Sequence, residues 1–206
     1  SFNGTLSAEI YDRNETLTCK DNDGSAGRIG RSPLTFTMHG HRVFRGTTRV
    51  ENGHFTITAS IPRDISYSDD AAKISFYAVS DDKQTECNGV NSGFHLNGTA
   101  EQASPDTLAP KVVAYLNEVE TPEYGVVNRN PTLIADISDD AGINIAGTSI
   151  GHDIELTLDD DLSNTTSLND YFTYAPGSYN SGQLVYRLPT LTPGLHTMTL
   201  RVWDVN

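Results

Sequence analysis

Apolar and polar residues alternate along most of the chain in short runs. The pattern is clear over residues 6–10, 55–61 and 74–78, where every second residue is apolar. Because successive side chains of a β-strand point to opposite faces, a period of two predicts half-buried antiparallel strands. Asn52-Gly53, between two of the strand-like runs, is the best hairpin signal in the chain. No stretch of about a dozen residues carries an apolar stripe at helical period, so we expect helices to be short and few.

A small, polar, proline-punctuated stretch at residues 103–110 (ASPDTLAP) divides these runs into two groups, as a linker does. After it the alternation restarts at residues 112–116, 133–137, 154–158, 184–188 and 198–202. We therefore predict an all-β protein of two tandem antiparallel immunoglobulin-like β-sandwich domains, 1–104 and 105–206. The last run ends just before Trp203, so we expect a piece of a longer protein whose closing strand is missing after Asn206.

The chain carries a formal net charge of −13, and the charge is unevenly placed. Residues 1–105 hold 10 Lys/Arg and 13 Asp/Glu, whereas residues 106–206 hold 4 and 14. Phosphate binding needs a basic face, so this composition argues against nucleic acid as a partner. The acidic second half favours cationic partners or metal ions. No apolar run is long enough to span a membrane.

Two cysteines, Cys19 and Cys87, lie on strand-like segments of the first half. In an exported protein they would form a disulfide closing a loop of about 70 residues, which stabilises by on the order of 4 kcal/mol. In a reducing compartment they would be two small core residues. Both alternatives stay open, because the sequence does not show whether the two Cα atoms come within bridging distance. Cys19 has one cationic neighbour, Lys20, and no oriented base, so we expect it to be unreactive.

The stretch 136–153 contains the G-x-S-x-G motif of serine hydrolases, in the residues Gly147, Ser149 and Gly151, followed by His152 and Asp153. A nucleophile elbow leads into a helix that supplies oxyanion-hole amides. Here the alternating residues 154–158 predict a strand instead. A histidine three residues from the serine is also poorly placed to act as its base, because triads are assembled from distant segments. We therefore expect no catalytic residue in this chain.

The same stretch has residues suited to holding an irregular loop in place. Its glycines, Gly142, Gly147 and Gly151, permit positive φ in a long connection between strands. Its aspartates can accept backbone N–H bonds that such a loop would otherwise leave unpaired. We further hypothesise that His152 packs beside Trp203 with its ring bonded to a carboxylate or carbonyl. The predicted structural anchors of the loop are Asp136, Asp139, His152, Asp153 and Trp203.

Two groups have residue types found in metal sites. His39 and His41 would share one face of a strand, but no third ligand lies nearby in the sequence, so we interpret them as exposed polar residues. Asp159 and Asp161, in the acidic turn 159–164, are the calcium candidates, because calcium prefers carboxylate and carbonyl oxygens. The turn matches only the first positions of an EF-hand loop, so a solvated loop is the alternative. No other cofactor is expected.

Several segments resemble one protein family in their order and spacing. They are residues 136–153, 168–171 (LNDY), 193–197 (PGLHT) running into 202–204 (VWD), and, in the first half, 44–48 (FRGTT), 52–55 (NGHF) and 61–65 (IPRDI). Together they resemble the region that follows the peptidase domain in PorU sortases, the cell-surface enzymes of the type IX secretion system of Bacteroidetes. The resemblance covers nearly the whole chain.

The resemblance implies a parent protein with a gingipain-like cysteine peptidase domain, at the extracellular side of the outer membrane of a Gram-negative bacterium. Such an enzyme removes the C-terminal signal of secreted cargo and attaches the cargo to surface lipopolysaccharide. Its Cys-His dyad would lie upstream of Ser1, and none of its catalytic residues maps onto this chain. The chain would then be a non-catalytic scaffold and docking surface for secreted cargo proteins or outer-membrane secretion components.

The alternative comes from the binding class, namely a surface adhesin or carbohydrate-binding module, since tandem sandwiches often present loops to ligands. Aromatic residues gather in one expected loop region, at Tyr171, Phe172, Tyr174 and Tyr179. Three coplanar, exposed rings there would favour sugar binding, whereas burial would favour a scaffold.

Overall fold

The computed structural model describes residues 1–63, 65, 69–97, 106–118, 125–147 and 151–206. Within them nearly all regular structure is β-strand, which confirms the all-β class. The first half contains β1 (Gly4–Tyr11), β2 (Asn14–Thr18), β3 (Thr35–His39), β4 (Arg42–Val50), β5 (Ala72–Ser80) and β6 (Glu86–Phe94). The second half contains β7 (Lys111–Leu116), β8 (Thr132–Ser138), β9 (Glu155–Leu158), β10 (Thr165–Ser167), β11 (Phe172–Tyr174), β12 (Ser181–Arg187) and β13 (Met198–Arg201).

Helical structure is brief in the described residues, as expected. It consists of the one-turn helix α1 (Ser25–Arg28) and two 3₁₀ turns, η1 (Leu162–Asn164) and η2 (Asn169–Tyr171). None of the helices described is long and apolar enough to cross a membrane.

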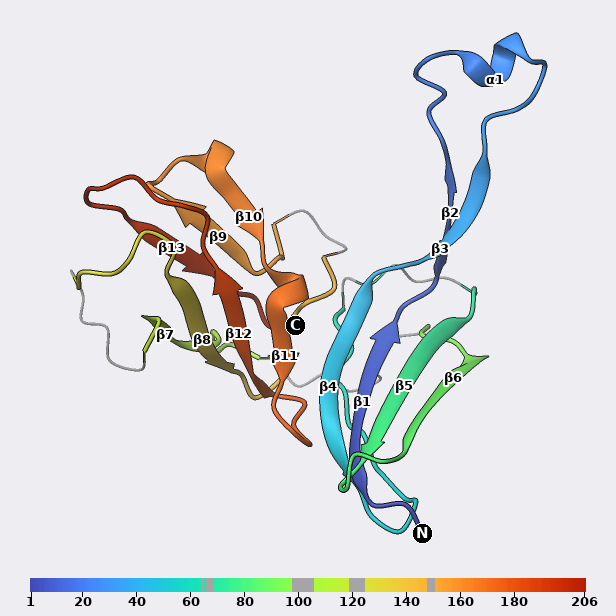
Figure 1. Cartoon of the computed structure of the whole chain (residues 1–206), viewed down its shortest axis with the longest axis horizontal. Coiled ribbons are helices and arrows are strands. Elements are labelled where there is room, and N and C mark those ends of the chain that lie inside the picture. The colour runs from blue at the N-terminus through green and yellow to red at the C-terminus, as the bar shows by residue number, and fades with distance from the viewer. Residues whose placement is uncertain (64, 66–68, 98–105, 119–124, 148–150) are drawn as a thin grey trace.

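The two halves of the chain meet in one sheet. Eight strands lie in the order β6-β5-β1-β4-β11-β12-β8-β7 (Figure 1). All neighbours pair antiparallel except β4 and β11, which are joined by a single parallel bridge between Gly46 and Tyr174. A second sheet, β10-β9-β13, packs the apolar side chains of β9 into the same buried cluster as those of β8 and β12.

The buried core also crosses from one half to the other. Its larger cluster contains Val43 and Phe44 of the first half together with Ile137, Phe172 and Leu184 of the second. A smaller cluster lies within the first half and is formed by Leu6, Ala8, Val50 and Ala78. The described residues therefore do not show two separate sandwiches, because only the second half has two strand layers of its own. The expected boundary at 104/105 lies outside the described residues.

Close approach of β11 to β4 requires glycine at position 46. A Cβ added to Gly46 would lie 2.8 Å from Cζ of Phe44 and 3.3 Å from Cβ of Tyr174. The rings of Phe44 and Tyr174 stack with centroids 5.0 Å apart, and Phe172 meets Tyr174 edge-on at 5.0 Å. The hydroxyl of Tyr174 donates to the carbonyl of Ile143 (2.6 Å) and accepts from its N–H (3.1 Å). We call Phe44, Gly46, Phe172 and Tyr174 the junction.

One predicted strand is absent. Asn52-Gly53 does form a tight turn, with positive φ at both residues and reciprocal bonds of 2.9 Å between Glu51 and His54. Residues 55–61, however, form no ladder with another strand. Their alternation has a different cause, since Ile57, Ala59 and Ile61 pack against the core clusters, while Thr58 faces water and Ser60 is half-buried. Alternation here reflects one-sided burial of an extended segment that covers the sheet.

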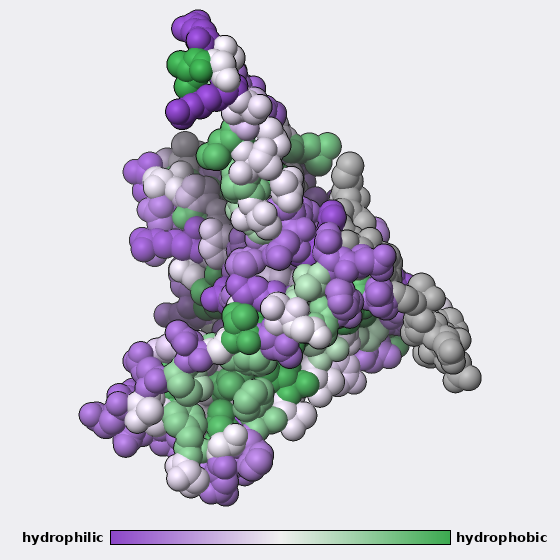
Figure 2. All heavy atoms as spheres, turned by 90° about the vertical axis from the view of Figure 1, so that its right-hand side faces the viewer, coloured by the Kyte–Doolittle hydropathy of each residue, from purple (hydrophilic) through white to green (hydrophobic). Residues whose placement is uncertain are grey.

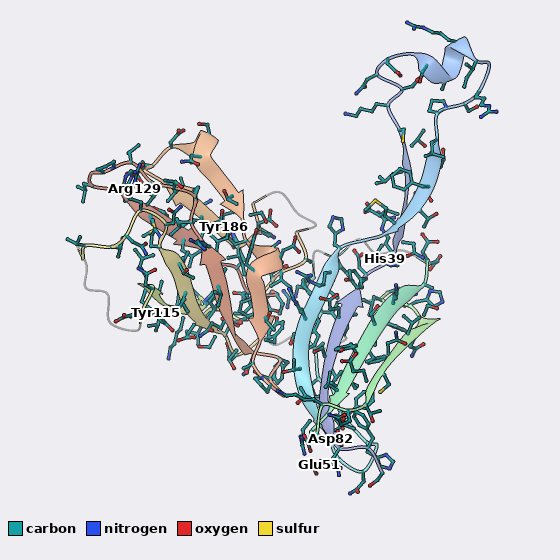
Figure 3. The ribbon with its side chains drawn as sticks, viewed as in Figure 1. His39, Glu51, Asp82, Tyr115, Arg129 and Tyr186 are labelled. Atoms are coloured by element: carbon teal, nitrogen blue, oxygen red, sulfur yellow. The ribbon has the colours of Figure 1, made fainter. Side chains whose placement is uncertain are left out.

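Residues 14–39, which we call the arm, were not anticipated as a separate unit. β2 and β3 form a two-stranded ribbon that carries α1 at its far end and extends away from the sheets (Figure 1). Every residue of the arm's strands is at least partly exposed. His39 marks its base in Figure 3, whereas Glu51 and Asp82 lie at the opposite end of the first-half sheet.

Candidate functional site

The glycines of the stretch 136–153 adopt the backbone expected of them. Gly142, Gly147 and Gly151 have φ of 115°, 62° and 88°. Gly147 is also confined, because a Cβ there would lie 2.9 Å from Oδ1 of Asp153 and 3.0 Å from Nδ2 of Asn169. Ser149, the central residue of the hydrolase-like motif, lies outside the described residues.

Asp153 and Asn169 connect this loop to the strand that follows it. Asn169 donates its side-chain amide to Oδ1 of Asp153 (2.7 Å), and its Oδ1 accepts the backbone N–H of Ile154 (2.8 Å). The chain then continues as strand β9, which confirms a strand after the motif where a nucleophile elbow would have a helix. Asp153 thus holds the loop through a side-chain amide, whereas we had expected backbone N–H groups. Asn169 is a residue that the sequence had not singled out.

The other two aspartates differ from each other. Oδ1 of Asp139 accepts the N–H groups of Ala141 (2.8 Å) and Gly142 (3.3 Å), which is the expected loop-holding role. Asp136 has a different partner, because it lies within β8, whose backbone is already paired. Its Oδ1 accepts the side-chain amide of Gln183 on β12 (2.8 Å).

Asp139 also belongs to a cluster of carboxylates. Within the described part of the chain, oxygens of Asp106, Asp139 and Asp204 all lie within 4.8 Å of one another. Burial raises the pKa of Asp139, and the nearby charges of Asp106 and Asp204 raise it further against the lowering effect of its backbone hydrogen bonds. Three carboxylates are the donor type that hard divalent cations prefer. Neither Asp106 nor Asp204 had been named as a ligand, because they lie far from Asp139 in the sequence.

His152 and Trp203 lie against each other, with ring centroids 4.9 Å apart at an interplanar angle of 39°. The carbonyl of Trp203 accepts the N–H of Asn144 (2.9 Å), and the carbonyl of Gly142 accepts the N–H of Val205 (3.1 Å). The end of the chain is therefore bonded to the loop 142–144, and the ring of His152 contacts the same Trp203.

A cleft of about 470 Å³ opens where the first half meets this loop. Its lining includes Tyr11, His41 and Arg42 from the first half and Gly147, Asp153 and Asp170 from the second. Arg42 crosses between the halves: its Nη2 donates to Oδ1 of Asp170 (2.7 Å), and its Nη1 lies 3.6 Å from Oε1 of Glu9. Burial, aided by a hydrogen bond to Glu9, raises the pKa of Tyr11.

The side of the cleft near the arm contains a buried acid. Oδ1 of Asp12 accepts the backbone N–H groups of Arg13 (2.7 Å) and His41 (2.8 Å) and so ties the two strands of the arm together at its base. Oδ2 of Asp12 and Nδ1 of His41 are 3.7 Å apart and, among the described residues, make no hydrogen bond. No hydroxyl or thiol in the described lining is hydrogen-bonded to His41, so this part of the cleft holds no assembled nucleophile–base pair.

His39 and His41 do not form the shared face that a continuous strand would give them. β3 ends at His39, and β4 begins at Arg42. His39 contacts the side chains of Asn14 (3.4 Å) and Lys73 (2.7 Å), while His41 faces Asp12.

The calcium candidates are bonded to groups within the protein. Asp159 accepts from Nδ1 of His196 (2.9 Å) and from the N–H of Thr197 (3.0 Å). These contacts lower the pKa of Asp159, and its carboxylate in turn raises the pKa of His196. Asp161 caps η1 by accepting the N–H of Ser163 (3.0 Å). Calcium at Asp159 and Asp161 stays a prediction.

Cys19 and Cys87 are free thiols, and both are exposed. The alternative that they are small core residues is therefore wrong. Cys87 lies on β6 at one edge of the large sheet, and Cys19 follows β2 on the arm.

The four aromatic residues between positions 171 and 179 do not form the platform that sugar binding would need. Phe172 and Tyr174 are buried in the junction, and only Tyr171 and Tyr179 are exposed. Tyr171 meets Tyr186 edge-on, with centroids 4.8 Å apart. Tyr186 is labelled in Figure 3. By the criterion stated from the sequence, this arrangement favours a scaffold.

These features define an all-β protein whose two halves share a sheet. Its glycine-rich loop around Gly147 is bonded to strand β9 and to the end of the chain. The chain matches no protein-family model and no curated protein. Among solved structures it is similar to the crystal structure of dimeric latent PorU from Porphyromonas gingivalis, with 27% sequence identity and a TM-score of 0.49. The similarity covers 99% of this chain and 19% of that one, so the chain spans about a fifth of the PorU length.

Proposed function

We propose that this chain is a non-catalytic β-sheet portion of a PorU-like cell-surface sortase, acting as a scaffold and as a docking surface for secreted cargo or outer-membrane secretion components. In this proposal the cysteine peptidase active site lies in another part of a longer protein. The segments that carry the sequence resemblance are the basis of the proposal, and the structural parts played by their residues support it.

The observation that carries the non-catalytic assignment is the arrangement around Gly147. Asp153, which a triad would use to orient a histidine, accepts the amide of Asn169. His152 lies against Trp203, and the motif leads into strand β9. These contacts explain the residues of the motif as parts of a loop that holds β9 and the end of the chain in place.

Incubation of the purified chain with fluorogenic peptide and ester substrates tests this assignment. We expect no turnover above that of a heat-unfolded sample. Turnover that Ser149→Ala abolishes would identify the motif as a working nucleophile elbow and overturn the proposal.

The docking part is tested separately, by surface plasmon resonance of the chain against an isolated C-terminal signal domain of a type IX cargo. We expect saturable binding, and we expect Arg42→Ala to weaken it by removing the contact that bridges the two sides of the cleft. A glycan array serves as the contrasting experiment, since selective glycan binding without cargo binding would favour a carbohydrate-binding module.

A further inference from the structure

The arm is a ribbon with two different faces. Leu17 pairs with Phe36 across the ribbon, and the N–H of Cys19 donates to the carbonyl of Leu34 (2.8 Å). Because alternate residues of a strand share a face, four apolar residues lie together, and we call them the stripe: Leu17, Leu34, Phe36 and Met38. Their exposed fractions are 42, 67, 40 and 49%. The opposite face carries threonine, at Thr16, Thr18, Thr35 and Thr37.

Such a ribbon is poorly stable when its apolar face is left in water. In the part of the chain that the structure describes, β2 and β3 pair only with each other, and no other element covers the stripe. Two-stranded hairpins of this length are marginal unless a further layer covers their apolar face. The arm is the projection at the top of Figure 2, where hydrophobic residues lie on the surface beside hydrophilic ones.

The charges of the arm indicate what kind of surface its apolar stripe would suit. Its three acids have partners: Asp21 accepts the N–H groups of Ala26 (3.0 Å) and Gly27 (3.4 Å), Asp23 accepts that of Ser25 (3.1 Å), and Glu15 lies 3.6 Å from Arg13. Its three cations are Lys20, Arg28 and Arg31, and their side chains make no ion pair or hydrogen bond with the described residues. The arm is thus balanced in charge, and residues outside it account for the whole net charge of −13.

The unpaired cations also lie close in the sequence to exposed apolar residues. Ile29, directly after Arg28, is 67% exposed, and Leu34 of the stripe follows Arg31 by three residues. These cations and Ile29 belong to the segment around α1, at the end of the arm that is farthest from the sheets in Figure 1. An apolar face next to free cations is complementary to an anionic interface.

We propose that the arm docks on an anionic lipid surface, with the stripe and Ile29 in the interfacial region and Lys20, Arg28 and Arg31 at the phosphate headgroups. A bilayer covers an apolar face without needing a complementary shape, and interfacial water satisfies the unpaired N–H and C=O groups of the ribbon's outer edges. The length of the arm keeps the negative charge of the rest of the protein away from the lipid. This inference does not depend on the function proposed above.

Vesicle co-sedimentation at low ionic strength tests the electrostatic part. We expect the chain to bind vesicles of equal parts phosphatidylcholine and phosphatidylglycerol and not vesicles of phosphatidylcholine alone. A basic residue near an anionic membrane contributes about fivefold in affinity, so the double variant Arg28→Ala/Arg31→Ala should bind ~25-fold more weakly. The matched control is Lys111→Ala/Arg187→Ala, which removes the same charge from the sheet and should stay within about twofold of the unaltered chain.

The apolar part is tested with Leu17→Thr/Phe36→Thr, which gives this pair the composition of the Thr pairs on the opposite face. Because threonine favours strands, the variant should keep the circular dichroism spectrum and the unfolding midpoint of the unaltered chain. We expect vesicle binding to fall at both low and high salt, whereas the Arg28→Ala/Arg31→Ala defect should shrink as salt rises.

Three outcomes would overturn the proposal. One is equal binding to both vesicle types, and another is an Arg28→Ala/Arg31→Ala variant that binds like its control. The third is a chain that binds no vesicles but forms a dimer in light scattering, with the dimer abolished by Leu17→Thr/Phe36→Thr. A second copy of the chain would then cover the stripe.

Discussion

The junction and the arm are built from similar strands but differ in what lies over them. Phe44 of the junction is 3% exposed, whereas Phe36 of the arm is 40% exposed, although each occupies an alternating position of a strand. At the junction a second segment, β11, approaches a glycine and places the ring of Tyr174 against Phe44, with Phe172 edge-on to Tyr174. The arm has no such neighbour among the described residues. Alternation therefore shows which residues share a face, and a distant segment determines whether that face is buried.

The largest expected effect separates these two phenylalanines directly. Phe44→Ala should lower the free energy of unfolding by ~3–5 kcal/mol, because it leaves a cavity beside Tyr174. Phe36→Ala should cost less than about 1 kcal/mol, because that ring is already in contact with water. Urea unfolding monitored by fluorescence measures both, and equal losses would contradict the distinction between the two regions.

A smaller effect is expected from the polar contact within the junction. Tyr174→Phe should cost about 1–3 kcal/mol, because it removes the hydroxyl that serves both the N–H and the carbonyl of Ile143 in a buried site. Tyr171→Phe is the control, since Tyr171 is exposed and should tolerate the change. A Tyr174→Phe chain as stable as its control would mean that water replaces the hydroxyl.

Asp139 should make the free energy of unfolding depend on pH in a direction that is unusual for a carboxylate. Its pKa is raised in the folded state, so the folded chain binds more protons than the unfolded chain between the ordinary and the raised value. Its contribution to stability is therefore fully present below the ordinary carboxyl pKa and is lost as pH rises through the raised one. Asp139→Asn keeps an acceptor for Ala141 and Gly142 but removes the charge, so it should be more stable than the unaltered chain at neutral pH.

Thermal unfolding of both chains between pH 3 and pH 8 checks this prediction, with the gain expected to be on the order of 1 kcal/mol or less. The advantage of Asp139→Asn should disappear in acid. A variant that is less stable than the unaltered chain at every pH would show that the carboxylate holds the loop better than an amide does.

The smallest effect is expected for the exposed pair Asp159 and His196. The hydrogen bond to Asp159 raises the pKa of His196, and the same bond lowers the pKa of Asp159. The pair is fully charged only between these two values, so its contribution is lost as pH rises through the raised value of His196 or falls through the lowered value of Asp159. By NMR titration, Asp159→Asn should return the pKa of His196 towards the ordinary histidine value, while Asp161→Asn should leave it unchanged. Neither variant should shift the unfolding midpoint measurably, because surface ion pairs contribute little.

Several parts of the fold were predictable because they depend on neighbours along the chain. Runs such as 6–10, 133–137 and 184–188 became strands, the turn at Asn52-Gly53 formed, and the glycines of the motif took positive φ. The strand after the motif excluded the local geometry of a nucleophile elbow, and this too was visible from residues 154–158 alone. Each of these features depends on side-chain period or on backbone freedom, which are local properties.

Features that join distant segments were missed. Residues 55–61 show the alternation of a strand but cover a sheet without joining one. Asp106 and Asp204 lie 33 and 65 residues away from Asp139 in the sequence, yet the three carboxylates meet in the fold. Asn169 completes the loop from a 3₁₀ turn that carried no motif. No local pattern distinguishes such residues from ordinary polar ones.

By itself the sequence determined that this is an acidic all-β protein with short turns and few helical residues, and that its G-x-S-x-G motif leads into a strand. The tertiary structure decided that the halves share one sheet at Gly46, that Asp153 is held by Asn169, and that the arm leaves its stripe exposed. The physical reason is that period and composition specify which side chains face the same way. What they face depends on long-range packing, in which the space beside a residue such as Gly46 matters more than the residues next to it in the chain.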